Sequence, residues 1–94
     1  MNKCLKITFS RITMPADFLR TVVNKYAKKL DIEGIAQVLM ADNKVRIIAC
    51  GLKEDVDNFL DLMHKRFSEL SIQDIEVEPF IKDKDYRNVF RIIE

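Results

Sequence analysis

Residues 5–30 read LKITFSRITMPADFLRTVVNKYAKKL. Within this stretch the spacing of the hydrophobic residues changes from every second residue to helical spacing. At the start, Leu5, Ile7 and Phe9 alternate with polar neighbours, which predicts a strand buried on one face. From about Pro15 to Leu30 the apolar residues recur at helical spacing, which predicts an amphipathic helix. A strand leading into a helix of this kind favours an architecture in which helices cover a sheet.

The same two periods return along the rest of the chain. Further strands are predicted over residues 35–40, 44–50, 72–77 and 89–93, the last one short, and a second helix over residues 52–67. This order predicts a single α+β domain over residues 1–94, a ferredoxin-like β-α-β-β-α-β sandwich with an antiparallel sheet and two helices on one face. The residues expected to meet in its core are Phe18, Val22, Tyr26, Val56, Phe59 and Met63 from the helices, and Leu5, Ile7, Phe9, Val45 and Ile47 from the strands.

Charge and hydropathy exclude several classes of protein. The 16 basic and 15 acidic residues leave a net charge of +1, which argues against a general nucleic-acid binder and against a membrane-surface binder. No apolar run approaches the roughly 20 residues that span a bilayer. The first six residues also lack the apolar stretch of a signal peptide. We therefore expect a cytoplasmic monomer.

The two cysteines, Cys4 and Cys50, form neither a disulfide framework nor a CxxC pair. We expect them to be reduced, partly buried thiols. Both alternate away from the core residues of their strands, so both should lie on the open face of the sheet. Because these strands are expected to be antiparallel neighbours, the two cysteines could be close, and whether they pair stays open. With His64 as the single histidine, soft ligands for a zinc site are also lacking.

Other candidate chemistry is weaker. Asp74, Glu76 and Glu78 alternate along one strand, which is more typical of a solvated sheet face than of an acid–base pair. His64 lies beside the apolar stripe of the second helix, and no nucleophile pattern accompanies it. Exposed aromatic residues that could stack on RNA bases are missing from the predicted strands.

Several stretches together resemble an acylphosphatase along nearly the whole chain. They are Arg20 with the helix end Ala27-Lys28-Lys29-Leu30, Gly34 fourteen positions after Arg20, Gly51 before the second helix, residues 72–77 and residues 90–92. The resemblance implies hydrolysis of the carboxyl-phosphate bond of acyl phosphates, without metal or cofactor. It also implies an anion-binding loop before the first helix, closed by a phosphate-binding arginine at Arg20. The position of the family's water-orienting asparagine, four residues after Gly34, is Val38.

The sequence departs from the family pattern in its catalytic parts. The expected anion-binding loop, Met14, Pro15, Ala16, Asp17, Phe18 and Leu19, has no glycine to allow close backbone approach. Pro15 donates no N–H, and Asp17 brings negative charge to the anion site. Val38 can neither donate nor accept a hydrogen bond, and Asn43 lies too far along the chain to replace it without a register change.

Two functions remain open. One is a divergent acylphosphatase with weak or lost turnover, in which Arg20 binds phosphate. The other is a non-catalytic module on the same fold that binds a small anion or a protein partner. The candidate partners are therefore a small phosphate-bearing molecule or a protein. We also expect Pro15 and Asp17 to cap the first helix in place of an empty anion cradle.

Overall fold

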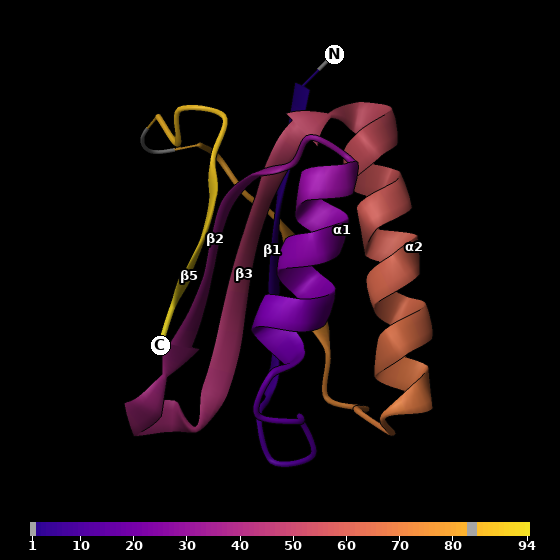
Figure 1. The fold of residues 1–94 in the computed structure, drawn as a ribbon, viewed down its shortest axis with the longest axis vertical. Helices are drawn as coiled ribbons and strands as arrows, with labels where there is room; N and C mark the ends of the chain where they lie inside the picture. The colour runs from indigo at the N-terminus through magenta and orange to yellow at the C-terminus, as the bar shows by residue number, and fades with distance from the viewer. Residues whose placement is uncertain (1, 83–84) are drawn as a thin grey trace.

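The computed structural model describes residues 2–82 and 85–94. In chain order the elements are β1 (Asn2–Ser10), a π-helical segment (Leu19–Val23) that runs into α1 (Asn24–Lys29), β2 (Glu33–Leu39), a 3₁₀ turn (Met40–Asp42), β3 (Lys44–Leu52), α2 (Lys53–Glu69), β4 (Glu76–Pro79) and β5 (Phe90–Ile93). Figure 1 shows α1 and α2 side by side on one face of the sheet. The predicted ferredoxin-like α+β fold is confirmed.

The sheet has five strands in the order β4-β1-β3-β2-β5. β1 pairs antiparallel with β3 and β4, and β2 pairs antiparallel with β3. β5, however, runs parallel to β2, so the sheet is mixed and not purely antiparallel as expected. The reason is topological: the chain crosses the open side of the sheet after β4 and enters β5 from the same end as β2 (Figure 1).

The core lies between the helices and the sheet, as the hydrophobic periods predict. All five expected strand residues are buried there, with Phe18, Val56, Phe59 and Met63, while Val22 and Tyr26 are half-buried at its margin. The rings of Phe9 and Phe67 lie 4.7 Å apart between their centroids. Burying one such side chain stabilises a fold by about 1.5–3 kcal/mol.

Both helices end in the same C-terminal motif. The N–H of Ile32 donates to the carbonyl of Ala27 at 2.8 Å, and that of Ile72 donates to the carbonyl of Phe67 at 2.9 Å. The intervening Asp31 and Ser71 take left-handed conformations with φ of 54° and 58°. These are Schellman ends, in which the apolar residue that follows turns back into the core. The predicted fourth strand therefore starts late, at Glu76, because Ile72 belongs to the helix end.

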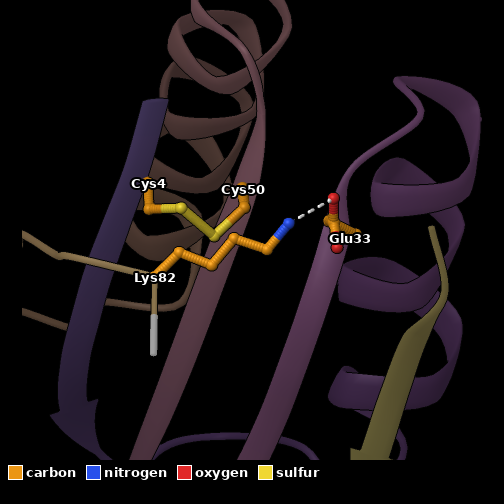
Figure 2. Close-up of a disulfide and its surroundings, with 4 residues drawn as sticks. All are labelled: Cys4, Glu33, Cys50 and Lys82. Carbon is orange, nitrogen blue, oxygen red and sulfur yellow. Dashed lines mark hydrogen bonds and ion pairs between the residues drawn. A yellow bond between two sulfur atoms is a disulfide. The ribbon is translucent and has the colours of Figure 1, made fainter. Parts of the chain in front are cut away.

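The cysteines contradict one expectation. Cys4 and Cys50 are direct partners in the β1–β3 register, and they form a disulfide with Cα atoms 4.1 Å apart (Figure 2). They do lie together on the open face, as the strand alternation predicts. The expectation of free thiols is wrong because it weighed cysteine number and compartment, whereas the register sets the two sulfurs opposite each other.

Candidate functional site

The loop between β1 and the first helix is built from two tight turns. The N–H of Met14 donates to the carbonyl of Arg11, and the N–H of Phe18 donates to the carbonyl of Pro15, both at 3.1 Å. These bonds use two backbone donors of the segment that would have to face an anion. The loop therefore satisfies part of its own backbone, and the helix starts near Phe18 and not at Pro15 as predicted.

The predicted self-cap at this helix start is not formed. Phe18 is the N-cap, with helical φ and ψ of −56° and −45°, and no side chain caps the helix. Asp17 acts through its backbone instead, since its carbonyl accepts hydrogen bonds from the N–H and the hydroxyl of Thr21 at 2.9 and 2.8 Å. The carboxylate of Asp17 is exposed.

A cavity of about 570 Å³ opens beneath this loop. Its walls join the loop to the end of β2, because Val38 lies beside Met14, Ala16 and Leu19. The remaining walls come from residues at the ends of the strands, namely Arg11, Ile12, Met40, Asn43 and Glu94. The structure thus brings half of the expected loop together with the expected water-orienting position, and the surface they share is largely apolar.

The other half of the loop faces elsewhere. Pro15, Asp17 and Phe18 line a smaller depression of about 190 Å³ between the start of the first helix and the end of α2. Arg66 lies on its far wall and donates a 2.8 Å hydrogen bond to the hydroxyl of Tyr26, which lowers the pKa of that phenol. A single cradle built from all six loop residues is therefore not present in this structure.

Arg20 does not line the larger cavity, but it pairs with a residue that does. Its side chain is exposed, and its Nε lies 3.4 Å from Oε1 of Glu94, which is itself a cavity residue. Exposed ion pairs of this kind contribute roughly 0–1 kcal/mol, so an incoming anion could displace the Glu94 carboxylate from Arg20. The predicted phosphate-binding arginine is thus accessible but already paired.

Arg11 was not singled out by the sequence analysis, and Asn43 was considered there only as a replacement for Val38 and set aside. Arg11 places Nη1 2.9 Å from the sulfur of Met40, and no carboxylate of the described residues lies within ion-pair distance of it. Asn43 reaches the same wall because the 3₁₀ turn and its own left-handed φ of 54° fold the hairpin back under the loop. A cation directly after a buried strand was the available signal for Arg11. Asn43 was set aside on its distance along the chain, which does not report the shape of the hairpin.

The remaining candidates are solvated side chains. Asp74, Glu76 and Glu78 are exposed, as predicted, and Glu78 faces Lys6 at 3.5 Å. His64 is exposed, and its ring lies edge-on to that of Phe67, with the centroids 6.3 Å apart. Across residues 2–82 and 85–94 no group of three His, Cys, Asp or Glu side chains could hold a metal, and no helix could span a bilayer.

Comparisons with known proteins agree with this fold. The sequence profile of the acylphosphatase family matches residues 18–92. No curated protein sequence matches the chain. An acylphosphatase structure from Coxiella burnetii has a TM-score of 0.72 at 22% identity, over 97% of this chain and 92% of that one.

Two further solved structures extend the comparison. An acylphosphatase from Bacillus subtilis has a TM-score of 0.71 at 19% identity, over 100% of both chains. Full-length HypF, in a phosphate- and nucleotide-bound form, has a TM-score of 0.71 at 20% identity, over 100% of this chain and 12% of HypF. Folds of this kind therefore occur both alone and inside larger proteins.

Proposed function

Because the family profile covers residues 18–92, the chain belongs to the acylphosphatase family, and we propose that it is a small-anion-binding domain whose acyl-phosphate hydrolysis is weak or lost. The observation that carries this proposal is Val38 on the cavity wall beside Met14 and Leu19. At the position where the family orients water, this chain offers an apolar surface.

The residues of the cavity suit binding better than turnover. Arg11 supplies positive charge on its wall, and Arg20 pairs with Glu94 of the same wall, while most of the other lining side chains are apolar. Such a surface fits an anion with an apolar body, for which a charged group fixes orientation and the walls supply contact. No metal or cofactor enters this proposal, and it describes a monomeric domain in the cytoplasm, spanning residues 1–94.

The alternative is a protein-interaction module. It is favoured by the occurrence of this fold inside larger proteins, since the chain matches only 12% of HypF and 28% of a bacterial light-regulated adenylyl cyclase. In that setting the cavity or a sheet edge would contact another domain. A measurement of small-anion binding in solution distinguishes the two functions, because only the anion-binding domain requires it.

Hydrolysis of benzoyl phosphate tests the first part of the proposal. We expect turnover at least about a hundredfold below that of the Bacillus subtilis acylphosphatase, because losing one preorganised donor costs about 10²–10³ in kcat. Val38→Asn combined with Ala16→Gly should raise the rate more than either change alone, since water position and loop geometry serve the same transition state. Robust wild-type turnover that disappears in Arg20→Ala would overturn the proposal.

Titration with inorganic phosphate, followed by NMR, tests binding. We expect weak binding near the loop that strengthens in Asp17→Asn and weakens in Arg20→Ala and Arg11→Ala. Lys25→Ala, which removes an exposed cation from the same helix, is the matched control and should change nothing. Phosphate-induced chemical shift changes that stay the same in Arg20→Ala and Arg11→Ala, or that decrease equally in Lys25→Ala, would favour the interaction module.

A further inference from the structure

A row of four residues crosses the open face of the sheet at the end away from the cavity. The strand registers place Cys4 opposite Cys50, and Cys50 opposite Glu33. Phe80 continues the row beyond β1, since its N–H donates to the carbonyl of Cys4 at 3.1 Å. Directly opposed residues on one face have Cβ atoms about 4.5–5.5 Å apart, so Cys50 has Cys4 as its cross-strand neighbour on one side and Glu33 on the other.

The described residues of the segment between β4 and β5 cover this row. Phe80 and Tyr86 pack on Cys4, Cys50 and Ile48, in a cluster separate from the main core. Cys50 is only 2% exposed, whereas Cys4 is half-buried. Cys4 is therefore the more solvent-exposed residue of the disulfide.

Charged groups accompany the buried sulfur. The ammonium of Lys82 lies 3.1 Å from Oε1 of Glu33, and Figure 2 shows its side chain extending past the disulfide to reach it. The other carboxylate oxygen of Glu33, Oε2, is buried and has no hydrogen-bond partner among the described residues. A buried acceptor without a donor costs about 1–3 kcal/mol, so its presence beside a cysteine calls for a reason.

We propose that Cys4 and Cys50 form a thiol–disulfide exchange site that reacts with a low-molecular-weight thiol. The thiolate of the incoming thiol attacks Sγ of Cys4, the S–S bond breaks, and Cys50 leaves as a thiolate. A second thiolate then attacks the small-molecule sulfur of the mixed disulfide, and Cys4 leaves as a thiolate. Two thiols thus become one small-molecule disulfide, and the protein gains two electrons and two protons. Oxidised small-molecule disulfide drives the reverse reaction.

Each neighbouring group has a part in this exchange. The Lys82 ammonium stabilises the departing Cys50 thiolate, because a nearby cation lowers the pKa of a thiol. Once Cys50 is protonated, its S–H can donate to Oε2 of Glu33, which supplies the donor that this oxygen lacks in the disulfide form. In the reduced state Oε2 of Glu33 thus has a hydrogen-bond donor, whereas in the oxidised state it is buried without one among the described residues. This inference is independent of the anion-binding proposal.

The first test measures which sulfur reacts. The oxidised-glutathione probe is added to Cys50→Ser and to Cys4→Ser, and mixed-disulfide formation is followed by mass spectrometry under native conditions. We expect Cys4 in the first variant to react at least about tenfold faster than Cys50 in the second, because Cys4 is the more exposed residue and exchange depends on access. Equal rates, or a faster Cys50, would overturn the assignment. NMR spectra of both variants check that they are folded.

The second test examines the charged neighbours in the wild-type chain. Mixtures of reduced and oxidised glutathione at graded ratios should interconvert the native disulfide and dithiol reversibly. Lys82→Met should slow the reduction of the disulfide several-fold. Lys44→Met, at the far end of β3, is the control and should not slow it. Glu33→Gln should shift the pH profile of Cys50 alkylation to lower pH, because a carboxylate that accepts the S–H bond opposes ionisation. A disulfide that is reduced only on unfolding, or profiles unmoved by both substitutions, would contradict the proposal.

Discussion

On the helix-covered face of the sheet, Ile7 and Phe9 of β1 are fully buried against Val45, Ile47 and the helices. On the opposite face of the same strands, Lys6, Thr8 and Arg46 remain partly exposed, and the described apolar contacts gather at one end around the disulfide. Both faces share one backbone and one register. The two faces differ in what stabilises them. The helix-covered face relies on the burial of apolar area, and the open face relies on a covalent bond, ion pairs and a covering segment.

The helix-covered face provides stability, whereas the open face carries the groups that can react. The apolar face offers no reactive group and tolerates little change, because close-packed interiors respond to the loss of even one methylene. The open face carries polar and sulfur groups whose partners can be exchanged without emptying a core. The following predictions test this contrast.

The largest effect is expected from a matched pair on β1. Phe9→Ala should lower the free energy of unfolding by about 3–5 kcal/mol, because it removes a ring that packs on Phe18 and Phe67 and leaves a cavity. The adjacent Thr8→Ala, on the open face, should change it by no more than about 0.5 kcal/mol. Urea unfolding of both variants measures the difference, and comparable losses would show that the open face is also a tightly packed surface.

A smaller effect should follow from the disulfide. The bond closes a loop with a sequence separation of 46 residues. The double variant Cys4→Ser/Cys50→Ser should therefore lose about 2–4 kcal/mol through greater freedom of the unfolded chain, while its native core spectrum stays unchanged. Thermal unfolding by calorimetry, with the reduced wild type as control, measures this loss. Disruption of the Phe9 and Phe67 resonances would mean that the faces are not independent.

The helix ends should give a gain in stability. Ser71→Gly should stabilise by about 0.5–1 kcal/mol, because a left-handed conformation costs about 1–2 kcal/mol for a residue with a Cβ. Asp31→Gly should gain less, since aspartate tolerates this conformation better than serine does. Denaturant midpoints at constant m-value report the ranking, and a loss in both variants would point to side-chain contacts that outweigh the backbone strain.

The smallest effect concerns Asp57 on α2. Its carboxylate lies 2.7 Å from the ammonium of Lys3 and 2.9 Å from that of Lys53. The hydrogen bond from Lys3, and then that from Lys53, lowers the pKa of Asp57. Stability from this group should be fully present above its unfolded pKa near 4 and be lost as pH falls through the lower folded pKa.

NMR titration of the Asp57 carboxyl checks this direction. Lys3→Met should move the titration toward the ordinary value more than Lys53→Met does, since Lys3 makes the shorter contact. A pKa at or above the ordinary value in the wild type would contradict the geometry.

The fold could be predicted from sequence wherever a local period was sufficient. Alternation in β1 and β3 and helical spacing in α2 identified the core, because burial on one side selects those periods whatever the loops do. Where the outcome depended on chain direction the sequence analysis failed. Whether β5 pairs parallel or antiparallel is set by the path of the segment before it, and that segment has no period.

The candidate site shows the same division. Val38 and Leu19 were named through the resemblance to the acylphosphatase family, and in the structure both line one cavity. Arg11 and Asn43 reach the cavity through turns whose shape depends on left-handed residues and hairpin geometry, which spacing does not contain. The disulfide was missed because the register that pairs Cys4 with Cys50 was used to predict proximity but not bonding.

The two outer strands carry a consequence for solubility. β4 forms one edge of the sheet, and its four residues include two glutamates and a proline, Glu76, Glu78 and Pro79. Charge and a missing N–H both discourage a second chain from adding to such an edge. β5, at the other edge, has a single charge at Arg91 and exposes Ile93. Self-association at high concentration should therefore begin at β5, and a lysine at Ile93 should delay it.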